Sequence, residues 1–193
     1  KAINHFKKAI EIQPNFAQAH NNLGTVLKEL EEYQKAINCH EKAIQIDPNY
    51  ADAHNNLGAI FSDLREYEKA VNCFKKAIQI NPDFATAQNN MGLAFRELEE
   101  PQKARSCYEK AIQIDSNYIN AYNNLGMILA EFNDLDEAKK CFEKSLSLDP
   151  NGKITCEGYG NLLLKLNQHN KAIAYFRKGT GLIKFTQKDF EII

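Results

Sequence analysis

The hydrophobic and polar residues of this chain recur with a period of 34 residues. A pair of asparagines followed by Leu or Met and then Gly occurs four times at this spacing, beginning at Asn21, Asn55, Asn89 and Asn123. A fixed period of this length indicates stacked helical hairpins, because each hairpin can bury its apolar face only against its neighbours. The pattern therefore predicts an all-α solenoid of antiparallel helix pairs.

Two apolar stripes within each period predict two helices. With Ala17 as position 1, positions 4, 7, 8 and 11 lie on one face of a helix that turns about 100° per residue. Small and large residues then alternate at positions 20, 24 and 27, for example at Ala70, Phe74 and Ala77, which suits close packing of a second helix. Glycine at position 8, for example Gly58, lacks a side chain and lets the second helix approach the first.

The boundaries of the repeats follow from the residues between the stripes. Proline at position 32 ends most of the second helices, because it cannot donate the helical hydrogen bond, and Asn or Asp at position 33 is predicted to cap the next helix. The solenoid is expected over residues 1–183: residues 1–16 as the second helix of a truncated repeat, full repeats at 17–50, 51–84, 85–118 and 119–152, and a degenerate terminal repeat at 153–183. Residues 184–193 are expected to be a capping tail or the start of a linker to a missing domain, with a helix beginning at 186–189.

The packing positions hold the same residue types in successive repeats. They are Gly24, Gly58, Gly92, Gly126 and Gly160 at position 8, Ala36, Ala70, Ala104, Ala138 and Ala172 at position 20, and His40, Phe74, Tyr108, Phe142 and Phe176 at position 24. This pattern resembles the tetratricopeptide repeat, and the resemblance covers the chain from Lys1 to about Ile183. It implies a right-handed superhelical solenoid with a concave groove that holds a segment of another protein. Position 4, where the family often has Trp, departs from the pattern with His20, His54, Gln88, Tyr122 and Cys156.

The paired asparagines are the main candidates for ligand binding. They are Asn21, Asn55, Asn89 and Asn123 at position 5, and Asn22, Asn56, Asn90 and Asn124 at position 6. By the same 100° count, positions 2, 5, 6, 9 and 13 lie roughly opposite the packing stripe, so we expect both amides to face the groove. An amide can donate to and accept from a peptide backbone of any sequence. This Asn ladder is similar to that of the O-linked N-acetylglucosamine transferases, where by resemblance it grips the backbone of polypeptide substrates.

Two further positions complete the candidate site. They are position 9, with Thr25, Leu93 and Met127, and the acidic position 13, with Glu29, Asp63, Glu97 and Glu131. Position 9 differs between repeats, as expected of a surface fitted to a non-repeating ligand, although drift of an exposed face gives the same pattern. Duplication is an alternative explanation of the ladder, since residues 17–50 and 51–84 are identical at 20 of 34 positions. The acidic row either lines the groove or is a solvated face.

Composition narrows the classes of function. The chain of 193 residues has a net charge of −1, which gives no general attraction to nucleic acid or membranes, and it has no apolar run long enough to span a bilayer. Four of its five cysteines share position 23, where a helix-packing distance of roughly 8–10 Å keeps them too far apart for a disulfide or a shared zinc ion. Free thiols fit the cytoplasm. No catalytic constellation, phosphate loop or Cys-x-x-Cys pair is present, so we expect no enzyme activity, cofactor or metal.

Three functions remain compatible with the sequence. The first is a scaffold for protein–protein interaction that binds an extended peptide in the groove. The second is the substrate-recruiting arm of a larger enzyme, with a parent similar to the glycosyltransferases or to proteins that pair such repeats with an oxygenase domain. The third is an assembly module with weak self-association through its exposed end repeats. The expected partner in the first two cases is a protein or peptide segment.

Overall fold

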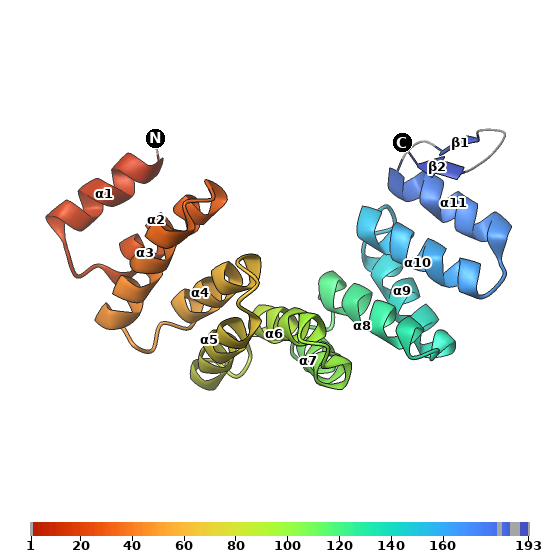
Figure 1. The fold of residues 1–193 in the computed structure, drawn as a ribbon, viewed down its shortest axis with the longest axis horizontal. Coiled ribbons are helices and arrows are strands. Elements are labelled where there is room, and N and C mark those ends of the chain that lie inside the picture. Colours follow the sequence, from red (N-terminus) through yellow and green to blue (C-terminus); the bar gives the residue numbers. More distant parts are fainter. Residues whose placement is uncertain (1, 181–182, 186–189, 193) are drawn as a thin grey trace. The chain divides into compact units, whose positions relative to one another are not determined.

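The computed structural model describes residues 2–180, 183–185 and 190–192 of the chain, and it divides into two compact bodies, residues 1–107 and residues 108–193. Each body is a stack of antiparallel helix pairs, which confirms the all-α solenoid of the repeats (Figure 1). The first helix of each full repeat begins at position 1 and ends at position 13, and the second helix begins at position 17. The hairpins therefore repeat in structure with the period that the sequence shows.

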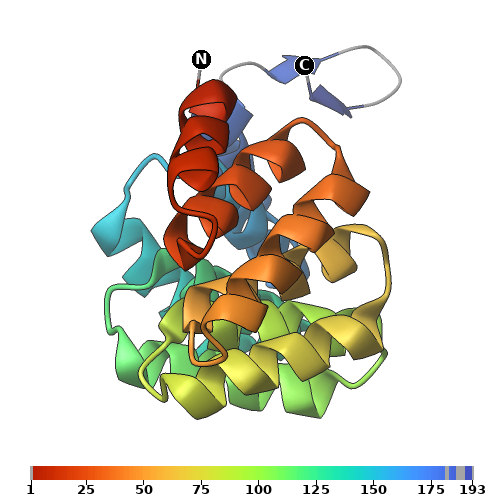
Figure 2. The ribbon, with the colours of Figure 1, turned by 90° about the vertical axis from the view of Figure 1, so that its left-hand side faces the viewer.

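The N-terminal body holds helices α1 to α6 and the beginning of α7. Their bounds are α1 Ala2–Ile12, α2 Ala17–Glu29, α3 Tyr33–Ile46, α4 Ala51–Asp63, α5 Tyr67–Ile80, α6 Ala85–Glu97 and α7 Pro101–Ile114. The pairs α2–α3 and α4–α5 pack most closely, α1 packs against α2 at the N-terminal end, and α4 also contacts α2 and α6 (Figure 2). First helices of successive repeats are thus neighbours in this body.

The C-terminal body holds the rest of α7 and the last four helices. Their bounds are α8 Ile119–Glu131, α9 Leu135–Leu148, α10 Lys153–Lys165 and α11 His169–Thr180, followed by strands β1 Ile183–Phe185 and β2 Phe190–Ile192. The strands pair antiparallel, with Lys184 opposite Glu191, and β1 contacts α11. The strand β1 agrees with the extended conformation that the sequence favours at residues 182–185, whereas β2 is an addition to the predicted pattern. Residues 186–189, which the sequence favours as a helix start, lie outside the described residues, and the roles proposed for residues 184–193 stay predictions.

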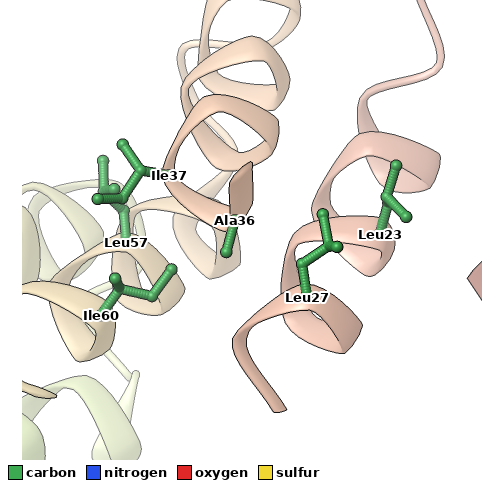
Figure 3. Packing of buried hydrophobic residues seen from close by; sticks show 6 residues of the cluster. All are labelled: Leu23, Leu27, Ala36, Ile37, Leu57 and Ile60. Carbon is green, nitrogen blue, oxygen red and sulfur yellow. The ribbon is translucent and has the colours of Figure 1, made fainter. Parts of the chain in front are cut away.

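The core of the N-terminal body has two layers, one on each side of α3. Figure 3 shows Ala36 facing the two leucines of α2, and Ile37 facing the apolar residues of α4; the cluster is Leu23, Leu27, Ala36, Ile37, Leu57 and Ile60. Ala36 is fully buried between α2 and α3. Position 20 holds a small residue because a larger side chain there would push the two helices apart. Helix α3 therefore belongs to two hydrophobic layers and ties its own repeat to the next one.

Glycine at position 8 makes room for the ring at position 24. A Cβ atom added to Gly58 would lie 2.7 Å from Cε1 of Phe74, and one added to Gly126 would lie 2.9 Å from Cε2 of Phe142. Both rings are almost completely buried. The predicted close approach of the two helices is thus a direct contact between ring and backbone.

The turns between the helices differ from the sequence-based expectation. The residue at the N-terminal cap of α2, α4, α6 and α8 is an aromatic residue at position 34, and its side chain makes no capping hydrogen bond. The predicted cap at position 33 is therefore wrong; instead the backbone N–H of Asn49 donates to Oδ1 of Asp47 at 3.0 Å and closes the preceding turn. Position 15 adopts a left-handed φ of 57° to 62° at Glu31, Arg65, Glu99, Asn133 and Asn167. Of these five residues only the two asparagines favour a left-handed conformation. At Glu31, Arg65 and Glu99 the surrounding structure imposes it.

Candidate functional site

One stripe of each first helix is accessible to solvent. Positions 2, 6, 9 and 13 are four, three and four residues apart, so they share one side of the helix. On α2, α4 and α6 positions 2 and 13 are exposed and positions 6 and 9 are half-buried. We call this stripe of the N-terminal body the Asn face; its residues are Gln18, Asn22, Thr25, Glu29, Asp52, Asn56, Ala59, Asp63, Thr86, Asn90, Leu93 and Glu97. In the C-terminal body α8 carries the corresponding stripe, with Asn124, Met127 and Glu131.

The expectation that position 5 also faces the open surface is wrong. Asn21, Asn55, Asn89 and Asn123 are only 5%, 7%, 3% and 3% exposed. Position 5 lies on the flank of the accessible stripe, and on α2 and α4 this flank is covered by the first helix of the next repeat. The 100° count around a single helix does not include that neighbour. Position 5 therefore supports the site from beneath.

The two asparagine positions are linked between repeats. Nδ2 of Asn56 donates to Oδ1 of Asn21 at 3.1 Å, and Nδ2 of Asn90 donates to Oδ1 of Asn55 at 3.2 Å. In both bonds the half-buried amide at position 6 donates to the buried carbonyl oxygen at position 5 of the preceding repeat. Without a hydrogen bond, burial of that oxygen would cost free energy. The pair Asn-Asn has a structural role that the sequence analysis did not predict.

We expect two equivalent asparagines, one with this inter-repeat bond and one without it, to differ in their contribution to the unfolding free energy. Asn90→Ala leaves Oδ1 of the buried Asn55 without its donor from Asn90, and after the gain in helix propensity we expect a net loss of about 1 kcal/mol in unfolding free energy. Among the described residues Asn22 has no such inter-repeat bond, so Asn22→Ala is expected to leave stability unchanged or to raise it slightly. Urea unfolding followed by circular dichroism measures both. Equal effects of the two substitutions would contradict a structural role for the inter-repeat bond.

The ladder ends in a different way in the terminal repeat. Position 6 is Gly158 there, and Nδ2 of the buried Asn123 donates instead to Oγ1 of Thr155 at 2.9 Å. Among the described residues, Oδ1 of Asn123 has no hydrogen-bond partner. The sequence contains no signal for Thr155, because position 3 is alanine in all four full repeats and no polar residue recurs there.

His40 takes part in the first of the Asn–Asn links. Its Nδ1 lies 3.0 Å from Oδ1 of Asn21, which already accepts from Asn56, so Nδ1 carries the proton and donates. The ring is fully buried, and its Nε2 has no partner among the described residues. Burial, with a smaller contribution from Lys28, lowers the pKa of His40 to about 4. His40 is therefore a neutral core residue at pH 7.

Two of the four acidic residues at position 13, Asp63 and Glu97, contact the preceding repeat. Nζ of Lys28 lies 3.1 Å from Oδ2 of Asp63, and the hydroxyl of Tyr67 donates to Oε2 of Glu97 at 3.2 Å. Desolvation and the Glu97 carboxylate raise the pKa of Tyr67, so this hydroxyl stays a donor at neutral pH. Sequence reasoning missed Lys28 and Tyr67 as neighbours of these acids, because the contacts join residues about 30 positions apart.

The described residues contain no arrangement suited to metal or thiol chemistry. They hold no group of three or more His, Cys, Asp or Glu side chains that could bind a metal ion. The five cysteines all lie in the described part of the chain and form no disulfide there. Burial raises the pKa of Cys73 to about 11, which keeps this thiol protonated and unreactive at pH 7. No helix in the described part of the chain is both long and apolar enough to cross a membrane.

Several solved structures share the fold of this chain. YrrB, reported as a TPR protein with an unusual peptide-binding site, is 25% identical with a TM-score of 0.69, and the match covers 91% of each chain. PilF of Pseudomonas aeruginosa is 22% identical with a TM-score of 0.80 and is matched over 89% of this chain and 78% of its own. MamA from Desulfovibrio magneticus RS-1 is 19% identical with a TM-score of 0.72, over 86% and 94% of the two chains. A comparison with curated protein sequences gives no significant match.

Sequence models of repeat families match nearly the whole chain. Models described as tetratricopeptide repeat or TPR repeat match residues 5–38, 24–64, 51–84, 83–151 and 155–185. The matches follow one another along the chain and include every hairpin described above. On this evidence, and in agreement with the helix pairs of the structure, the chain belongs to the tetratricopeptide repeat family.

Proposed function

We propose that this chain is a protein-interaction scaffold whose Asn face binds an extended segment of a partner protein. The observation that carries the proposal is the half-buried asparagine at position 6 of α2, α4 and α6, which lies between exposed positions on an accessible stripe. Its amide can exchange hydrogen bonds with a peptide backbone whatever the side chains of the peptide are. YrrB, which shares the fold along most of its length, is reported with a peptide-binding site, and this supports the same class of ligand here.

The buried asparagines at position 5 have a supporting role in this proposal. Because Asn21 and Asn55 hold the amides of Asn56 and Asn90, these half-buried side chains are fixed before a ligand arrives. A fixed side chain loses less conformational entropy on binding, so each hydrogen bond to the ligand contributes more to affinity. Position 9, with Thr25, Ala59 and Leu93, then distinguishes one partner from another, since it is the position of the face that changes most in size.

Blocking the middle of the Asn face tests the proposal. Ala59 is half-buried at position 9 of α4, and Ala59→Arg would place a long side chain across the path of a bound segment. Peptides selected from a random display library on the immobilised chain should bind the variant at least about tenfold more weakly, which corresponds to about 1.4 kcal/mol. Isothermal titration calorimetry measures the affinities.

The matched control adds the same charge elsewhere. Asn72 is exposed on the second helix α5, so Asn72→Arg is expected to leave the affinity of the selected peptides unchanged. If both variants bind equally well, the ligand does not lie on the Asn face and the proposal fails. Recruitment of substrates to a larger enzyme, self-assembly and a cytoplasmic location stay predictions of the sequence.

A further inference from the structure

The two Asn–Asn bonds of the N-terminal body run in the same direction. In each, the half-buried side chain at position 6 is the donor and the buried side chain at position 5 is the acceptor. One N–H of Asn56 and one of Asn90 is therefore already used within the protein. Oδ1 of Asn56 accepts only a long contact of 3.5 Å from Asn55, and Oδ1 of Asn90 accepts from no protein group in the described part of the chain. Each of these half-buried amides therefore keeps its carbonyl oxygen for a ligand that donates, together with its second N–H.

Charge on the Asn face also favours a donor ligand. The charged residues of the face are all acidic and all exposed; they are Glu29, Asp52, Asp63 and Glu97. The nearest bases are Lys28, which pairs with Asp63 at 3.1 Å, and Arg96, whose Nη2 lies 3.8 Å from Glu97. Exposed ion pairs of this kind are worth only about 0.2–1 kcal/mol, so an incoming Lys or Arg can compete for the carboxylates.

The spacing of the repeats selects the conformation of the ligand. The helices α2, α4 and α6 are packed neighbours, and packed helices lie about 8–10 Å apart. A polyproline II chain rises about 3.1 Å per residue with three residues per turn, so it presents the same side every 9 Å or so. A β-strand presents the same side about every 6.7 Å, which does not match this spacing. One residue in every three of a polyproline II segment would meet successive repeats.

We infer that the Asn face recognises an extended, polyproline II-like segment with a Lys or Arg at every third residue. In this arrangement backbone N–H groups donate to Oδ1 of the position 6 asparagines, and the basic side chains meet the carboxylates of position 13. The inference rests on the proposed function and specifies the chemistry of the partner at the same site.

Three labelled peptides test the inference with the 193-residue chain in fluorescence anisotropy. The first has four copies of Lys-Pro-Gln, the second has the same composition with its lysines grouped at one end, and the third has four copies of Glu-Pro-Gln. The first peptide is expected to bind about tenfold more tightly than the second and more tightly still than the third. Equal affinity of the first two peptides would overturn the three-residue register. Tightest binding of the acidic peptide would overturn the choice of a basic partner and leave the proposed function standing. Failure of all three to bind, together with failure of display selection, would overturn both.

A pair of triple variants separates the site from the net charge of the protein. Glu29→Gln/Asp63→Asn/Glu97→Gln removes three carboxylates of the Asn face, whereas Glu11→Gln/Glu41→Gln/Glu68→Gln removes three exposed carboxylates from α1, α3 and α5. Both raise the net charge equally. The first variant is expected to bind the Lys-Pro-Gln peptide about tenfold more weakly and the second to bind it as the parent does. Equal weakening in both would show that the peptide responds to overall charge, and the inference would be wrong.

Discussion

Acidification from pH 7 to pH 4 is expected to lower the unfolding free energy by about 3 kcal/mol through His40 alone. Its pKa falls from 6.5 in the unfolded chain to about 4 in the folded protein, because the ring is buried and lies near Lys28. The unfolded chain therefore takes up this proton first as the pH falls. The destabilisation begins near pH 6.5 and is complete near pH 4, at about 1.4 kcal/mol per unit of pKa difference. Urea unfolding at several pH values gives the curve.

The equivalent residues of other repeats supply the control. Position 24 is Phe74 and Phe142 in two of them, so His40→Phe places a ring that the fold already accepts. The variant should still lose stability in acid as its carboxylates become protonated. It should not show the fall of about 3 kcal/mol in unfolding free energy that protonation of His40 causes between pH 6.5 and pH 4. Asn21 keeps its bond from Asn56. Identical pH dependence of the two proteins would contradict a neutral, buried His40.

Gly58→Ala is expected to destabilise the chain by about 2 kcal/mol, even though alanine is the better helix former. The new Cβ would lie 2.7 Å from Cε1 and 2.9 Å from Cδ1 of Phe74, whose ring is fully buried and cannot move outward. Overpacking of a filled core costs about 1–3 kcal/mol, occasionally more, and the gain in helix propensity is at most about 1 kcal/mol. The steric term is therefore expected to exceed the gain. Thermal and urea unfolding measure the net change.

A second substitution tests the cause of this loss. Phe74→Leu shortens the side chain that the new methyl group meets, so the double variant Gly58→Ala/Phe74→Leu should be more stable than the sum of the two single effects. A coupling of at least about 1 kcal/mol is expected from the double-mutant cycle. Additive effects, or a stabilised Gly58→Ala, would show that helix α5 moves to make room.

The sequence predicted the hairpins correctly because their packing depends on residue types that recur every 34 residues. Small residues such as Gly58 and Ala70 meet large ones such as Phe74, and this complementarity is visible without coordinates. The burial of Asn55 was not visible, because it depends on the first helix of the neighbouring repeat and not on the helix that carries it. The left-handed turn at Glu99 was also missed, since glycine, the usual signal for that conformation, is absent there.

The candidate site could be predicted in part. Helical periodicity alone selects position 6 and position 13, and the structure places Asn90 and Glu97 on the accessible stripe. The direction of the bond from Asn90 to Asn55 could not be inferred, because an amide can donate or accept and only the geometry of the two helices decides. Their role in ligand binding stays a proposal.

The Asn–Asn bonds have a consequence for how the N-terminal body loses its structure. Each bond joins two successive repeats, so it exists only while both hairpins are folded. Its free energy belongs to the interface between nearest neighbours and is lost whichever of the two unfolds. The repeats that these bonds join are therefore expected to lose their structure cooperatively, since unfolding of either one lowers the stability of the other.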